Sequence, residues 1–205
     1  MYFCSNDWLN LQIKVGLTTY ANFMTVFGKL NHYSFKKNSE ENMKTLYLIR
    51  HAKSSWGEIG SLDIDRSLDE RGHRDAPKMA QKLKDLGVKP SLILTSPAKR
   101  ALMTAQYFAK EFQIAEEAIV VEDDIYEADV TDIQHIVKNL PAEARTVLMF
   151  GHNPTFTYFA NIYNDEIIDN LPTCGVVKID VGTEGWSKFS ENTANVVDYF
   201  FPKNI

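Results

Sequence analysis

Two histidines and two arginines of this sequence lie where expected buried strands end. Arg50 and His51 directly follow the first apolar run, Arg100 lies one helical turn after the second, and His152 follows the fourth. Each arginine carries a permanently charged planar fork that suits phosphoryl or carboxylate oxygens. A neutral histidine can attack phosphorus, and a second, protonated histidine can share the charge that builds up on the other oxygens. The four residues therefore predict an anion site that contains a nucleophile.

These residues need a sheet to bring them together, and the sequence has the pattern of one. Short apolar runs typical of buried strands alternate with segments of helical spacing. This alternation favours an α/β fold with a mainly parallel sheet and helices on both faces. In such sheets ligands collect beyond the carboxyl ends of the strands. The expected strands lie at residues 46–49, 92–94, 119–121, 146–150, 176–181 and 194–200, and helical spacing covers 76–86, 98–112 and 133–140.

Two helices are expected to begin next to the anion site. Ser96 followed by Pro97 is typical of an N-cap and a first helical residue. The pair Asn153-Pro154 again indicates a turn into a helix. Backbone N–H groups and the positive dipole end at each helix start would add donors for an anion.

Composition and charge exclude several classes of protein. The chain has 205 residues, of which 44% are hydrophobic and 24% charged, as in an ordinary globular domain. Its net charge of -5 excludes bulk attraction to nucleic acid or anionic membrane, and no run approaches the ~20 apolar residues of a membrane span. Cys4 and Cys174 are too few for a disulfide framework. We therefore expect a cytoplasmic protein with no nucleic-acid or membrane partner.

No metal or other cofactor is expected. His51 and His152 supply two ligands at most, and no HxH or HExxH spacing supplies a third. The two cysteines are likewise too few for a cysteine-only zinc site.

Residues 1–42 differ from the rest of the chain. They hold 8 of the 24 aromatic residues and carry four basic against three acidic residues, whereas the remainder has 18 basic and 24 acidic residues. No charged n-region or cleavage site frames a secretory signal, and the polar run at 36–42 is typical of a linker. We hypothesise that 1–42 is a disordered or non-native extension, that Met43 is the natural start, and that 43–205 is the catalytic domain. The alternative is an amphipathic arm packed on that domain.

Four stretches resemble the motifs of a known family. Residues 48–56 (LIRHAKSSW) resemble the Arg-His-Gly/Ala signature of the histidine phosphatase superfamily, whose fold is shared with phosphoglycerate mutases. Residues 96–105 (SPAKRALMTA) are similar to the second element of that family, and 151–154 (GHNP) to the third. Residues 65–72 (DRSLDERG) resemble the stretch between the first two. The short chain most resembles the SixA-type phosphohistidine phosphatases.

The resemblance implies a three-layer α/β/α fold and a division of labour among the four residues. His51 would be the nucleophile that becomes phosphorylated, and Arg50, Arg100 and His152 would bind the phosphoryl group. Water would then hydrolyse the phosphohistidine without a metal.

Around this set the sequence offers further candidates. Lys53, Ser54 and Trp56 are candidates for the rim of the site. Mutase-like members have an asparagine after the tryptophan, where this chain has Gly57. Glu127 is the candidate for the acid that protonates a leaving oxygen, and its alternative is a solvated carboxylate in an acidic loop.

The functional hypothesis is a phosphatase with a covalent phosphohistidine intermediate that acts on phosphohistidine of a protein phosphotransfer domain. One alternative is a phosphatase for small phosphate esters, with a mutase less favoured because the asparagine and the long insertions are missing. The other alternative is a non-catalytic module that binds phosphorylated partners through Arg50, Arg100 and His152.

Overall fold

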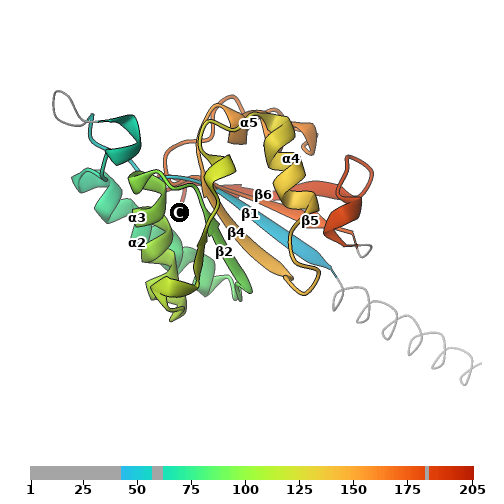
Figure 1. Ribbon diagram of the computed structural model, residues 1–205, viewed down its shortest axis with the longest axis horizontal. Helices are drawn as coiled ribbons and strands as arrows, with labels where there is room; N and C mark the ends of the chain where they lie inside the picture. The colour runs from blue at the N-terminus through green and yellow to red at the C-terminus, as the bar shows by residue number, and fades with distance from the viewer. Residues whose placement is uncertain (1–42, 57–61, 183–184) are drawn as a thin grey trace, which may run out of the picture. The chain divides into compact units, whose positions relative to one another are not determined.

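The computed structural model describes residues 43–56, 62–182 and 185–205, and residues 43–205 form one compact unit (Figure 1). The hypotheses on residues 1–42 lie outside the described residues. The strands are β1 (Lys44–Arg50), β2 (Leu92–Thr95), β3 (Ile119–Val121), β4 (Thr146–Gly151), β5 (Val176–Val181) and β6 (Ala194–Phe200). The α-helices are α2 (Glu70–Asp85), α3 (Lys99–Phe112), α4 (Val130–Lys138) and α5 (Thr155–Ile162). Short 3-10 turns are η1 (Asp63–Asp65), η2 (Glu116–Ala118), η3 (Asp123–Ile125) and η4 (Trp186–Lys188).

The strands form one sheet of order β3-β2-β4-β1-β5-β6. The four strands from β3 to β1 are parallel, while β5 runs antiparallel to β1 and β6 antiparallel to β5. Arg50 pairs with Gly151, and Thr95 pairs with Phe150. The carboxyl ends of β1, β4 and β2 therefore lie level at one edge, which confirms the predicted mainly parallel sheet and brings its strand ends together.

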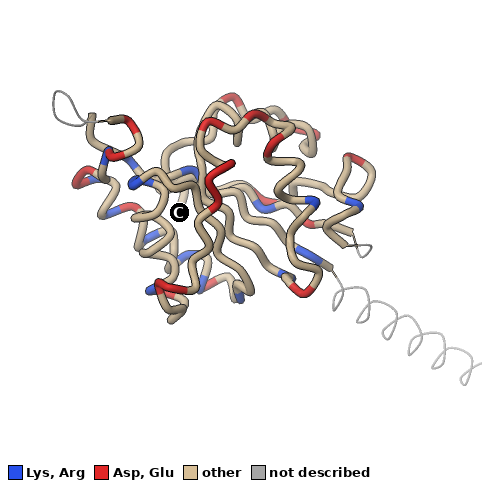
Figure 2. Tube along the Cα trace, in the orientation of Figure 1, with Lys and Arg blue, Asp and Glu red and all other residues tan. Residues whose placement is uncertain are grey.

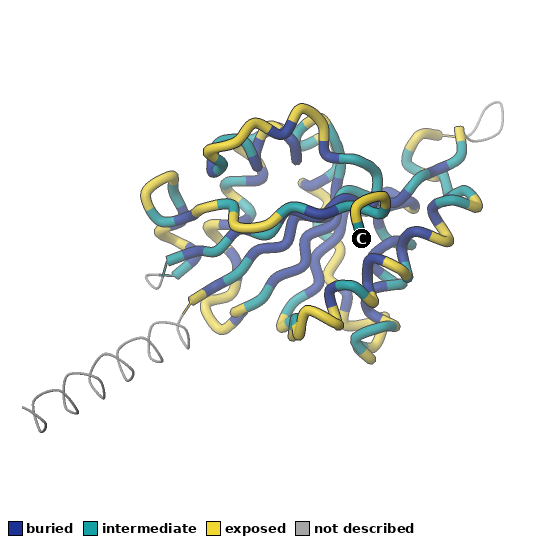
Figure 3. The backbone as a smooth tube through the Cα atoms, turned by 180° about the vertical axis from the view of Figure 1, so that it is seen from behind, coloured by how far each residue is buried: buried dark blue, intermediate teal, exposed yellow. Residues whose placement is uncertain are grey.

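Helices cover both faces of the sheet, as predicted (Figure 1). Tyr47, Ile49 and Phe150 point to the face packed by α2 and α3, where Met79 and Phe108 are fully buried. The alternate strand residues pack on the other face against α4, α5 and η4. In the view from behind, the strands form the buried middle layer and exposed positions lie on the helices and loops (Figure 3). The alternation of side chains along each strand thus builds two cores on a rigid sheet.

The helix starts near the strand ends differ from the prediction. Helix α3 begins at Lys99 with Ala98 as its N-cap, so the prediction of Ser96 as N-cap and Pro97 as first helical residue is wrong. The backbone N–H of Ser96 still donates to the carbonyl of Phe150 at 3.0 Å, which keeps Ser96 attached to the sheet. Helix α5 begins at Thr155, directly after the Asn153-Pro154 turn, as expected.

A close backbone contact holds the loop after β1 on the start of α2. The Asp69 side chain caps α2 by accepting from the Gly72 N–H at 2.8 Å, and the Asp69 N–H donates to the Lys53 carbonyl at 3.0 Å. A Cβ atom on Gly72 would lie 2.1 Å from that carbonyl oxygen. Only glycine permits this approach, which fixes how closely the loop after His51 lies against the start of α2.

The variant Gly72→Ala should therefore displace the Lys53 backbone. We expect the free energy of unfolding to fall by about 1–3 kcal/mol, the usual cost of overpacking, and the backbone NMR resonances of residues 52–54 to shift. Gly87→Ala is the control, because Gly87 has a φ of +76° but no atom within 4 Å of an added Cβ. It should cost about 1 kcal/mol and leave those resonances in place. Equal behaviour of the two variants would contradict the contact.

Candidate active site

His51 lies at the end of β1 with its proton placement set by the backbone. Its Nδ1 lies 2.7 Å from the carbonyl oxygen of Ala52. A carbonyl oxygen can only accept, so Nδ1 carries the hydrogen and Nε2 keeps its lone pair. Burial, followed by the charges of Arg100, Arg50 and Arg66, lowers the pKa of His51 to about 4, although the Ala52 hydrogen bond opposes this. The ring is therefore neutral near pH 7 and presents Nε2 as a nucleophile.

Residue Ala52 is itself held by helix α3 through its backbone N–H. This N–H donates to Oγ1 of buried Thr104 at 3.0 Å, and that hydroxyl donates to the carbonyl of Arg100 at 2.7 Å. The helix that supplies Arg100 thus also anchors the residue whose carbonyl orients His51.

Arg50 precedes His51, and a backbone carbonyl holds one end of its guanidinium. Its Nη1 donates to the carbonyl of Leu171 at 2.7 Å. Its Nε is buried and has no hydrogen-bond partner among the described residues. Because an unpaired buried N–H is costly, this group is a ready donor for an anion.

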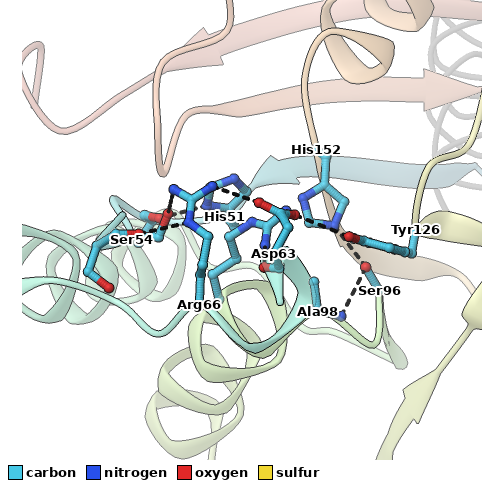
Figure 4. Close-up of polar contacts among 11 residues, drawn as sticks. His51, Ser54, Asp63, Arg66, Ser96, Ala98, Tyr126 and His152 are labelled. Carbon is cyan, nitrogen blue, oxygen red and sulfur yellow. Dashed lines mark hydrogen bonds and ion pairs between the residues drawn. The ribbon is translucent and has the colours of Figure 1, made fainter. Parts of the chain in front are cut away.

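Arg100, on α3, is buried and binds a carboxylate that the sequence analysis had not assigned to the site. Its Nη1 donates to the Asp63 carbonyl at 2.6 Å, and its Nη2 to Asp63 Oδ2 at 2.8 Å. Arg66 Nη1 donates to Oδ1 at 2.8 Å, and the Tyr126 hydroxyl to Oδ2 at 3.1 Å (Figure 4). The hydrogen bond from Arg66, followed by that from Arg100, lowers the pKa of Asp63 to about 2 against the opposing effect of burial. Asp63 is therefore ionised at neutral pH.

His152 follows β4 and faces His51. The two ring centroids are 5.3 Å apart, and His152 Nε2 lies 2.8 Å from the hydroxyl of Ser96. Since that hydroxyl oxygen accepts from the Ala98 N–H at 3.3 Å, its hydrogen is available to His152 Nε2. In that arrangement the hydrogen of His152 resides on Nδ1, a buried atom without a partner in the described part of the chain.

The sequence analysis considered a protonated second histidine, and the structure favours a neutral ring for the site as it stands. Burial, followed by the charges of His51 and Arg100, lowers the pKa of His152 to about 3. The ring is neutral near pH 7, and what it offers an anion is one N–H group rather than a charge.

The structure thus brings Arg50, His51, Arg100 and His152 to one edge of the sheet, as predicted. It adds Asp63, Arg66 and Tyr126, to which the sequence analysis had assigned no role, and Ser96, which was expected only as a helix N-cap. Arg66 lies in the family-like stretch between the first two motifs, so that stretch was the available signal. The contact of Tyr126 with Asp63 joins residues 63 positions apart, and no local pattern indicates it.

The three rim candidates have separate surroundings. The Ser54 hydroxyl is buried and accepts from Arg66 Nη2 at 3.0 Å, so it supports Arg66 rather than forming a rim. Trp56 is 86% exposed and its ring lies 5.3 Å from the Arg66 guanidinium carbon. Lys53 contributes its carbonyl to the α2 contact.

Glu127 is exposed and lies beside the loop that carries His152. It adopts a left-handed φ of 61° and lines a cavity of about 170 Å³ together with His152, Asn153 and Thr155. Its position next to His152 keeps it a candidate acid.

Among the described residues, no three His, Cys, Asp or Glu side chains form a group that could hold a metal ion. Basic and acidic positions are interspersed along much of the described chain (Figure 2). The positive charge near His51 has a local origin in Arg50, Arg66 and Arg100.

Comparison with known proteins identifies the family. Residues 46–159 match the family model of the histidine phosphatase superfamily (branch 1). The chain belongs to this superfamily. Its members are phosphatases and mutases, so the match supports phosphatase activity on a phosphorylated substrate.

Two curated relatives resemble this superfamily member over most of its length. An uncharacterised chloroplastic protein of Arabidopsis thaliana is 31% identical over 153 residues, which cover 71% of this chain and 70% of the relative. Phosphoserine phosphatase 1 of Hydrogenobacter thermophilus is 29% identical over 129 residues, which cover 60% of each chain.

Solved structures confirm the phosphoglycerate mutase-like fold. An Agrobacterium tumefaciens protein assigned as the phosphohistidine phosphatase SixA aligns with a TM-score of 0.64 and 28% identity, over 77% of this chain and 97% of that one. The protein histidine phosphatase SixA in complex with tungstate aligns with a TM-score of 0.67 and 20% identity, over 78% and 98% of the two chains.

Within the described ranges, no helix is long and apolar enough to cross a membrane. One curated relative is chloroplastic by name, and the cytoplasmic location of this chain stays a prediction.

The lowered pKa values of the half-buried His51 and His152 predict how stability depends on pH. Their folded-state pKa values of about 4 and about 3 lie below the 6.5 of an unperturbed histidine, so below pH 6.5 the unfolded chain binds more protons. The free energy of unfolding should therefore decline from pH 6.5 toward pH 4, as measured by urea denaturation. The contribution of Asp63, whose pKa is lowered to about 2 from 3.8, is lost only at lower pH.

The control is the double variant His51→Asn, His152→Asn, which removes both titrating rings. Its stability should change less between pH 6.5 and pH 4.5 than that of the wild type. The same slope in both proteins would contradict the assignment of these two histidines as neutral.

Proposed function

We propose that this protein is a metal-independent phosphatase that forms a covalent phosphohistidine at His51 and acts on phosphohistidine carried by a protein. The observation that carries the proposal is the neutral His51, whose unprotonated Nε2 lies among Arg50, Arg100 and His152. An attacking nitrogen and donors for the charged oxygens are thereby supplied by side chains of one sheet edge.

The first chemical step is transfer of the phosphoryl group to His51. Nε2 forms a bond to phosphorus while the bond from phosphorus to the leaving atom breaks, and its electron pair goes to the leaving group. The unpartnered Nε–H of Arg50, the free N–H groups of Arg100 and the ring N–H of His152 are suited to bind the phosphoryl oxygens. The positive charge of the two arginines and the N–H dipole of neutral His152 stabilise the negative charge of the transition state.

The second step regenerates the enzyme. Water attacks phosphorus, the bond to Nε2 breaks, and the electron pair returns to the His51 ring. The products are inorganic phosphate, which keeps both protons of the water, and neutral His51, whose hydrogen stays on Nδ1 and is donated to the Ala52 carbonyl throughout. No redox partner or other co-reactant is needed.

The phosphohistidine substrate is supported by a leaving-group argument and by the SixA-like structural relatives. An alkoxide is a poor leaving group and benefits from a positioned acid, whereas imidazole is a far weaker base, with a conjugate-acid pKa of ~6.5. Glu127 is exposed, and within the described residues it makes no hydrogen bond to the site. A substrate whose leaving group departs without help from an acid suits such a site.

A small phosphate ester is the second candidate substrate. The observation in its favour is the relative named phosphoserine phosphatase 1, together with Glu127 lying beside His152 where an acid could serve an alkyl leaving group.

The variant His51→Ala tests the proposed nucleophile. We expect kcat to fall by about 10⁴-fold or more on both p-nitrophenyl phosphate and a phosphohistidine-bearing phosphotransfer domain, because losing a nucleophile removes the covalent route. His135→Ala is the matched control, since His135 is an exposed histidine on α4, and it should keep wild-type activity. Full turnover by His51→Ala would refute the mechanism. A wild type that binds phosphorylated substrates but hydrolyses none of them would favour the non-catalytic binding module.

The variant Glu127→Gln separates the two candidate substrates. If Glu127 is the acid, hydrolysis of an alkyl phosphate such as phosphoserine should slow by about 10²–10⁴-fold, while turnover of phosphohistidine should be unchanged. Glu117→Gln, which neutralises an exposed carboxylate in η2, is the control. Equal loss on both substrates would argue against the leaving-group account.

A further inference from the structure

Asp63 is a carboxylate inside a site built for an anion, and the mechanism above does not use it. Arg66, Arg100 and Tyr126 all donate to its oxygens, and its own carbonyl binds Arg100 as well (Figure 4). So many donors fix the position of this negative charge, which lies near enough to His152 to act on its pKa.

The charges around the site leave room for Asp63 and a phosphoryl group together. Arg50, Arg66 and Arg100 all lower the pKa of His51 through their charge, so all three lie near it. Three arginines and one carboxylate leave a net charge that balances a phosphoryl dianion. Arg100 gives only two of its five N–H groups to Asp63. A phosphoryl group therefore need not displace Asp63.

The remaining hydrogen-bonding capacity of Asp63 selects for a donor. An ionised carboxylate has about four lone-pair sites, of which Oδ2 uses two, for Arg100 and Tyr126, and Oδ1 uses one, for Arg66. The side chain as a whole is 51% exposed, so a substrate group can approach the carboxylate. Phosphoryl oxygens of a dianion cannot fill the open position on Oδ1 because they are acceptors. An N–H group on the leaving group can.

We propose that Asp63 recognises the leaving group by accepting a hydrogen bond from a protonated nitrogen, which makes the site selective for phosphoramidates over phosphate esters. The inference rests on the proposed function and specifies the substrate class of that same site. Asp63 would then touch the substrate and determine specificity.

For a phosphorylated imidazole the chemistry balances without a general acid. The ring carries its proton on the nitrogen that does not bear phosphorus, and this N–H donates to Asp63. When His51 Nε2 bonds to phosphorus, the P–N bond of the substrate breaks and its electron pair stays on the ring. The ring already holds the proton, so it leaves as neutral imidazole. A phenolate or alkoxide leaving group instead gains negative charge near the Asp63 carboxylate, which disfavours it.

The test compares Asp63→Asn with wild type on N-phosphoimidazole and on p-nitrophenyl phosphate, whose leaving group has no N–H. For N-phosphoimidazole, kcat/KM should fall about tenfold or more, since a hydrogen bond to a charged acceptor is lost. For p-nitrophenyl phosphate it should rise or fall much less, because the altered contact with Arg100 affects both substrates alike whereas the lost acceptor affects only N-phosphoimidazole. Asp65→Asn is the matched control, because it removes the same charge from an exposed residue of the same turn. It should leave the ratio of the two kcat/KM values at the wild-type value.

Each other outcome contradicts the inference. A rise on both substrates would mean that Asp63 only competes with phosphate for Arg100, and an equal fall would mean a structural role. Asp63→Ala gives a second measure of the same ratio should the asparagine variant fold poorly. If Asp63→Asn shows the expected ratio change but the wild type does not dephosphorylate a phosphohistidine protein, the result contradicts the proposed protein substrate and not the role of Asp63.

Discussion

The chemistry of this protein depends on one hydrogen bond, from His51 Nδ1 to the carbonyl oxygen of Ala52. A histidine among three arginines is kept neutral by burial and by their charge, but neutrality alone does not decide which nitrogen is free. The Ala52 carbonyl decides it, because an acceptor holds the hydrogen on Nδ1. Thr104 of α3 accepts from the Ala52 N–H, and Gly72 lets α2 approach the Lys53 carbonyl. Both helices on this face of the sheet thus hold the backbone that follows His51.

The second constraint is that anion affinity must arise inside an acidic protein. The net charge of the chain is -5, so long-range attraction does not help a phosphorylated substrate. Arg50 at the end of β1 and Arg100 on α3 instead place donors near His51. Asp63 offsets part of their charge, which leaves an excess suited to a dianion. Donors held in place close to His51 therefore take the role that a positive net charge would have in attracting a phosphoryl group.

The mainly parallel sheet and the four central residues were predictable because they follow local signals, namely apolar runs and the motifs at their ends. The role of Asp63 was not, since it depends on contacts with Arg100 and Tyr126 from distant segments. The predicted helix start after Ser96 was wrong because the Ser96 N–H donates to the Phe150 carbonyl of the sheet and its hydroxyl binds His152. The neutral state of His152 likewise follows from burial, which the sequence pattern does not measure.

The central claim is that Nε2 of His51 carries the phosphoryl group during turnover. The most direct measurement is to quench the enzyme under alkaline conditions during turnover of a ³²P-labelled substrate and to determine the site and isomer of the phosphorylated residue by mass spectrometry and ³¹P NMR. The account predicts one phosphate per chain, on Nε2 of His51. Phosphate on Nδ1 of that ring, on another residue, or on none during steady turnover would contradict it.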